Sequence, residues 1–159
     1  MDKALWEAIR QTGARGRLFE ERRFCQHGTT SVYAHSVRVA AVSLYLARRL
    51  RLRFDEAALL RGALLHDCFL YDWHDRDNGH LLYGFSHPRT ALENARRDYD
   101  LSEAECDVIL HHMFPLVPMP PRCREAWIVC MADKYCALAE TLAPLGKLAR
   151  RLVPLWQQR

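Results

Sequence analysis

Several histidine and aspartate residues of this chain stand where an isolated polar side chain is unexpected. His35 lies on the apolar stripe of a helix expected over 31–50, and the pair His66-Asp67 follows an apolar run in the next helix. Asp133 lies on the apolar face of a later helix. A buried carboxylate without a partner costs several kcal/mol. These side chains must therefore find polar partners or a ligand inside the fold.

Three further histidines stand at expected helix ends. His87 should open a helix, and His111 and His112 should close another. Imidazole nitrogens and carboxylate oxygens are ligands that Fe, Mn, Zn and Ni accept, so one divalent metal site would satisfy the whole set. Taken singly, each residue has a simpler interpretation as a hydrogen-bonded core histidine, an ion pair or a solvated helix end. The ordered set is what favours a metal site.

Helices are expected throughout the chain, and they would position this set. Hydrophobic spacing and breakers predict helices over 2–11, 31–50, 56–71, 87–98, 103–112 and 122–142, with an amphipathic segment over 145–153. Thr29 or Thr30 should cap the second helix and Asp55 the third. Ser102 and Glu105 have the spacing of a capping box.

No alternating strand pattern and no tight hairpin signal is present, so we expect an all-α bundle of about six to eight helices. Residues 72–86 should form a polar loop, with Ser86 capping the following helix, and Pro144 should end the last long helix. We expect a single domain over 1–159. Its core should span about 25–143, with a helix before it and an amphipathic helix after it.

Composition narrows the class of protein. Half of the 159 residues are hydrophobic and the mean hydropathy is −0.25, as in an ordinary globular domain. No apolar run approaches the roughly 18 residues of a membrane span, and the N-terminus lacks the pattern of a signal peptide. The six cysteines include no CxxC pair, which argues against a zinc ribbon and a disulfide scaffold. We therefore expect a cytoplasmic protein with reduced thiols and no membrane partner.

Charge is segregated along the chain. Residues 1–53 hold eleven basic and four acidic residues. Residues 54–118 hold five basic and twelve acidic residues, and residues 119–159 hold seven basic and three acidic residues. An acidic, histidine-rich middle between basic flanks favours a metal site beside groups that meet an anionic substrate, although solvated surfaces would also explain it. The basic N-terminal run lacks a nucleic-acid motif, so we expect no nucleic-acid partner.

The order of these residues resembles the HD-domain superfamily of metal-dependent phosphohydrolases. The resemblance spans about residues 25–140, and its motifs read SVYAHSVRVA, GALLHDCFLYDW, HPRTALENA, VILHHMFPL and VCMADKYC. A QHGxTS stretch before the first of these motifs is similar to a group of small, stand-alone bacterial HD proteins. The resemblance implies an all-α core with the metal site between helices.

The resemblance also implies a ligand set. The minimal set corresponds to His35, His66, Asp67 and Asp133 and holds one metal ion. A binuclear version adds two histidines and lets Asp67 bridge the ions, and His87 and His112 are the candidates here. His112 is preferred to His111 because it follows Val108 and Ile109 by one turn, which leaves His111 as an outer ligand or substrate contact.

The implied chemistry is hydrolysis by metal-activated water. One or two divalent ions (Fe, Mn, Zn, Ni or Mg) would lower the pKa of bound water, with His66 and Asp67 at the centre of the reaction. The substrate would be a phosphoester or phosphoanhydride of a small molecule, with a nucleotide as the first candidate. Possible substrate or outer contacts are Arg38, Arg89, Lys134, His27, Trp73 and His74.

The chain departs from the family pattern in ways that leave the substrate open. Cys68 stands where many relatives begin a Gly-Lys element, and Leu70 replaces the glutamate of the nucleotidase branch. A second hypothesis is therefore a metal-containing nucleotide sensor without catalysis, able to form a homodimer through the segment from Leu145 to Trp156. A di-iron HD oxygenase is a third.

Overall fold

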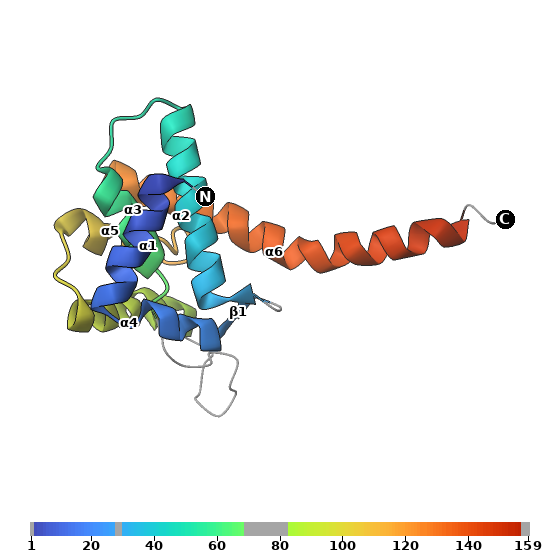
Figure 1. Ribbon diagram of the computed structural model, residues 1–159, viewed down its shortest axis with the longest axis horizontal. Helices are drawn as coiled ribbons and strands as arrows, with labels where there is room; N and C mark the ends of the chain where they lie inside the picture. Colours follow the sequence, from blue (N-terminus) through green and yellow to red (C-terminus); the bar gives the residue numbers. More distant parts are fainter. Residues whose placement is uncertain (1, 28–29, 69–82, 157–159) are drawn as a thin grey trace.

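The described part of the chain is a helical bundle, which confirms the predicted fold class. A computed structural model describes residues 2–27, 30–68 and 83–156 (Figure 1). Its helices are α1 (Lys3–Arg15), the 3₁₀ helix η1 (Leu18–Arg23), α2 (Val32–Arg49), α3 (Glu56–Leu65), α4 (Tyr83–Asp98), α5 (Glu103–His111) and α6 (Arg124–Trp156). These seven helices lie within the expected number.

A small strand pair was not predicted. β1 (Cys25–His27) pairs antiparallel with β2 (Thr30–Ser31) just before α2. Strands of two and three residues are too short to show an alternating pattern. The pair leads the chain into α2, and Ser31 caps that helix by accepting a hydrogen bond from the backbone N–H of Ala34. The expected cap at Thr29 or Thr30 was therefore wrong by one or two residues.

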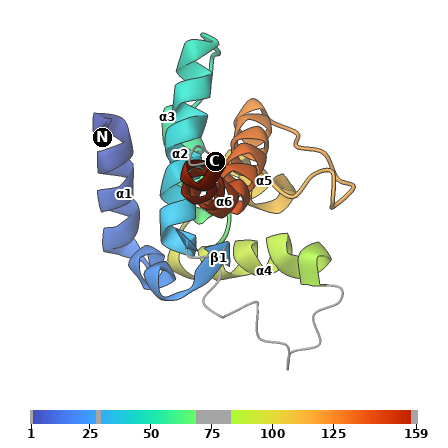
Figure 2. The same ribbon diagram turned by 90° about the vertical axis from the view of Figure 1, so that its right-hand side faces the viewer.

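The helices pack around a core formed by α2, α3, α5 and the first half of α6. α2 contacts α3 and α6, α3 contacts α5, and α5 contacts α6. In both views α4 lies across one end of this group, and α1 flanks α2 and α3 (Figures 1 and 2). The C-terminal half of α6 extends away from the other elements (Figure 1). Several helix ends and turns therefore meet near α4.

Gly62 allows the close approach of two site-bearing helices. It lies on α3, and a Cβ atom placed on it would be 3.0 Å from the Cβ and Cγ1 atoms of Val108 on α5. Both helices end where site residues begin, at His66 and His112. The packing of α3 on α5 therefore fixes the separation of these two histidines.

The predicted caps explain where two helices begin. Asp55 accepts a hydrogen bond from the N–H of Ala58 at the start of α3. Ser102 and Glu105 form the reciprocal capping box of α5. Both predictions are confirmed, because each depends on residues within one turn of the helix start.

Two helices end or begin elsewhere than expected. α3 ends at Leu65, not near residue 71, because the ring of His66 donates to the carbonyl of Ala63 and the N–H of Cys68 bonds to Leu65. α4 begins at Tyr83, so Ser86 is inside the helix and is not its cap. His87 consequently lies one turn inside α4.

α6 is longer than expected. It continues through Pro144 to Trp156, although a proline removes one helical hydrogen bond. The flanking sequence is rich in Ala and Leu, which have high helix propensity.

The part of α6 that packs on the bundle also carries exposed apolar side chains, namely Trp127, Met131, Tyr135, Leu138 and Leu142. Self-association through this helix stays a prediction. No described helix is both long and apolar enough to cross a bilayer.

The core contains one unusual carboxyl group, Glu21 of η1. Its side chain is fully buried. No N–H or O–H group of the described residues donates to either of its oxygens. Burial, together with the nearby charge of Asp67, raises the pKa of Glu21 well above its usual value. Keeping this carboxyl inside the core at neutral pH therefore costs folding free energy.

The α3–α5 contact predicts the effect of Gly62→Val. The added side chain must displace Val108, and overpacking of this kind costs about 1–3 kcal/mol. The free energy of unfolding, measured by urea denaturation, should fall by that amount. Gly62→Val gains helix propensity, because valine is a better helix former than glycine, so any loss must come from packing. Ala57→Val on the exposed face of α3 is the control for placing a β-branched side chain in this helix. Equal losses in both variants would contradict the close-approach role.

Glu21→Gln should stabilise the metal-free protein increasingly as pH rises. The raised pKa means that the native state binds more protons than the unfolded state. The contribution of Glu21 to wild-type stability therefore falls as pH rises above the unfolded pKa near 4.5. The glutamine variant loses this dependence and should gain up to about 1.4 kcal/mol per pH unit in that range. Urea denaturation between pH 4.5 and 8 measures the gain. The exposed neighbour Glu20→Gln is the control, and a trend shared by both variants would refute the assignment.

Candidate metal centre

The six predicted ligands lie on five different helices or just beyond their ends and converge on one buried cluster. α2 supplies His35, α4 supplies His87 and α6 supplies Asp133, whereas the others follow the last turns of α3 and α5. Each is at most 9% exposed. The members of the cluster are His35, His66, Asp67, His87, His112 and Asp133.

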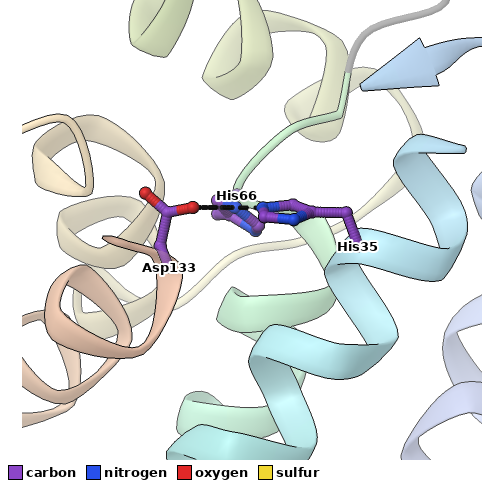
Figure 3. A group of neighbouring side chains, drawn as sticks. All are labelled: His35, His66 and Asp133. Carbon is purple, nitrogen blue, oxygen red and sulfur yellow. Dashed lines mark hydrogen bonds and ion pairs between the residues drawn. The ribbon is translucent and has the colours of Figure 1, made fainter. Parts of the chain in front are cut away.

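His35, His66 and Asp133 form one group of potential ligands. Their side chains point toward one another from three separate elements (Figure 3). The Oδ1 atom of Asp133 is 3.1 Å from Nε2 of His35 and 3.7 Å from Nε2 of His66. Their donor atoms all lie within 4.8 Å of one another, which is close enough for one ion to reach all three.

Asp67 lies between two sets of imidazoles. Its Oδ2 atom is 3.2 Å from Nε2 of His66 and 3.7 Å from Nε2 of His35. Its Oδ1 atom faces the other way, 2.7 Å from Nε2 of His87 and 3.3 Å from Nε2 of His112. The two oxygens of one carboxylate therefore serve opposite halves of the cluster.

Two rings are held in the tautomer that a metal ligand needs. Nδ1 of His66 donates to the carbonyl of Ala63, and Nδ1 of His112 donates to that of Ile109, each at 2.8 Å. When these rings are neutral, their Nε2 atoms carry the lone pairs, and both Nε2 atoms are buried without a hydrogen-bond partner among the described residues. Such buried lone pairs, aimed at two carboxylates, fit a divalent cation.

His35 is held by a residue that was not predicted from the sequence. Its Nδ1 atom is 3.0 Å from Oε2 of Glu140, a buried residue on α6. Arg38 forms an ion pair with the other oxygen of Glu140. The available signal was spacing, because Glu140 follows Asp133 by seven residues and so lies on the same helix face. The structure gives Arg38 this partner, and its predicted contact with substrate stays a prediction.

Burial and neighbouring groups shift the pKa values of the cluster residues. Burial would raise the pKa of Asp67, but the charge of His66 and hydrogen bonding by His112 hold it well below the usual range. Burial lowers the pKa of His112. Burial also opposes protonation of His35, yet hydrogen bonds with Asp133 and Glu140 raise its pKa to about 9. Protons therefore compete with a metal for these ligands, and metal affinity should decrease as pH falls.

His111 and Lys134 have structural partners. Nδ1 of His111 is 2.6 Å from Asp107, whose other oxygen accepts hydrogen bonds from the N–H groups of Arg122 and Cys123. Among the described residues a second group of potential ligands, His66, Asp67 and His112, also has its donor atoms within 4.8 Å of one another, and His111 belongs to neither group. The Nζ atom of Lys134 donates to the carbonyl of His112 at 2.6 Å, so it caps the end of α5. Both residues thus hold the chain around the site.

The other predicted contacts are less defined. Arg89 lies exposed on α4, two residues after His87. His27 ends β1, and nothing further is described for its side chain. Trp73 and His74 lie outside the described residues. A role of these four residues in substrate binding stays a prediction.

The comparison with known proteins agrees with this geometry. The family model described as HD domain matches residues 32–138, well over half of the chain. That stretch contains all six clustered residues. Neither the curated proteins nor the solved structures include a significant match. HD domains are generally metal-dependent hydrolases. The match over residues 32–138 shows that this chain is a member of the HD-domain family.

Proposed function

We propose that this chain is a binuclear metal-dependent phosphohydrolase that acts on a small phosphorylated compound. The observation that carries the proposal is the two-sided placement of Asp67, whose Oδ2 faces His35 and His66 while Oδ1 faces His87 and His112. A carboxylate placed in this way can be shared between two cations. A single ion would leave one half of this buried histidine cluster without a function.

The proposed ligands divide into two positions. The first comprises His35, His66, Asp133 and one oxygen of Asp67, and the second comprises the other oxygen of Asp67 with His87 and His112. Bound divalent ions would act as Lewis acids toward a phosphoryl oxygen, and they would lower the pKa of bound water toward neutrality. The donors are all imidazole or carboxylate, which suits Fe, Mn, Zn or Ni, and Mg is a further candidate.

The chain's own residues would hold these donors in place before substrate arrives. The carbonyls of Ala63 and Ile109 fix the rings of His66 and His112, so little rearrangement is needed when ions bind. Arg89 is exposed on α4, two residues after His87, and its guanidinium is a candidate to bind a phosphate. A nucleotide is the first substrate class to test, on the basis of the family resemblance.

Asp67→Asn should abolish hydrolysis. An amide cannot supply two anionic oxygens, so the loss should exceed the roughly 10–100-fold typical when a hydrogen-bonded neighbour of a ligand is removed. Protein loaded with Mn or Fe should be assayed against phosphomonoesters, cyclic nucleotides and dinucleoside polyphosphates. Metal binding without turnover of any compound by the wild-type protein would overturn the proposal and favour the sensor hypothesis. Oxygen consumption by the iron-loaded protein would favour the oxygenase.

His112→Gln and His111→Gln form a matched pair of adjacent substitutions. His112→Gln removes a lone pair that faces Asp67 and should reduce the bound metal by about one ion per chain and lower hydrolysis by at least about tenfold. His111→Gln breaks only the contact with Asp107 and should keep the wild-type metal content while lowering the melting temperature. Metal content measured by mass spectrometry after gel filtration separates the two. The reverse pattern would exchange the proposed roles of the two residues.

A further inference from the structure

Three ligand histidines of the site are held through Nδ1 by acceptors of different charge. His66 and His112 donate to backbone carbonyls, both at 2.8 Å. His35 instead has the carboxylate of Glu140 at 3.0 Å. Glu140 is 8% exposed and His35 is fully buried, so little solvent screens this contact. His35 is thus the ring among these three whose Nδ1 faces an anionic side chain.

The charge of that acceptor affects the opposite nitrogen of the ring. A carboxylate that accepts the Nδ1 proton increases the electron density at Nε2 and raises the basicity of the ligand, more than a neutral carbonyl does. Nε2 of His35 faces Asp133 and Asp67, which is the side where the first metal position lies. At the second position, Nδ1 of His112 instead donates to the neutral carbonyl of Ile109.

We infer that Glu140 is a positioning residue that makes the metal position of His35, His66 and Asp133 the tighter of the two. This inference rests on the proposed binuclear site and adds an order of filling. The first ion should occupy the position that contains His35, and the second should bind more weakly at the side of Asp67 that faces His87 and His112.

Arg38 allows this role to be separated from that of a simple ion pair. Arg38 and Glu140 form a salt bridge in which the arginine side chain is 49% exposed and the glutamate side chain 3% exposed. Substituting either residue breaks the salt bridge, but only a change at Glu140 removes the acceptor for His35. Removal of Arg38 leaves the contact between the carboxylate and the ring in place.

Calorimetric titration of the metal-free full chain with Mn²⁺ tests the inference. Wild-type protein should bind two ions in two phases. Glu140→Leu should weaken the tighter phase by about 10–100-fold and leave the weaker phase within about twofold. Glu140→Gln should lie between wild type and Glu140→Leu, because its amide oxygen still accepts from Nδ1 without the negative charge. Arg38→Gln should retain wild-type affinity in both phases.

Glu105→Gln is the matched control. Glu105 is also a buried glutamate paired with one arginine, since Arg61 lies 2.7 Å away, but it caps α5 and does not contact a ligand histidine. This variant should lose stability and keep both metal phases. Circular dichroism and thermal melting show whether each variant is folded, and Glu140→Gln serves where Glu140→Leu does not fold.

Three outcomes would overturn the inference. They are unchanged affinity in both Glu140 variants, an equal loss in Arg38→Gln and Glu140→Leu, and an equal weakening of both phases by Glu140→Leu. A failure of the proposed function looks different, because the wild-type protein would then bind both ions with the expected dependence on Glu140 and hydrolyse no phosphate compound.

Discussion

The buried carboxylate of Asp67 is the interaction on which the rest of the site depends. Its side chain is 3% exposed and lies within 3.7 Å of four imidazole nitrogens that come from α2, α4 and the ends of α3 and α5. A charged group buried so deeply is stable only when it is surrounded by such partners. The bundle must therefore bring these elements together, and Gly62 helps by allowing α3 to approach α5.

The fold also controls the direction in which each ring faces. His66 and His112 follow the last turns of their helices, where backbone carbonyls lack partners inside the helix, and each ring donates to the carbonyl three residues before it. The helix end thus provides the acceptor that turns Nε2 into the cluster. His35 is in the first turn of α2, where no such carbonyl is free, and it uses Glu140 of α6 instead.

The sequence predicted the fold class, and His35, His66, Asp67 and Asp133 stood out because polar residues on apolar faces have few alternatives to a shared site. His87 and His112 were expected to join them because of the family resemblance. The sequence also predicted two helix starts, at Asp55 and Ser102, since caps act within one turn. The role of Glu140 could not be predicted in this way, because its partners His35 and Arg38 are about a hundred residues away in the chain. The start of α4 and the passage of α6 through Pro144 were missed because local breaker signals count for less than the surrounding helix.

The arrangement links metal occupancy to stability. Six polar side chains occupy positions in the core that apolar residues would fill at lower desolvation cost, and Glu21 adds another buried carboxyl nearby. A cation that binds the native state and not the unfolded state stabilises the fold by mass action. It also replaces protons as the positive partner of Asp67 and Asp133. The same carboxylates that weaken the metal-free core would therefore provide the free energy by which the loaded protein is stabilised.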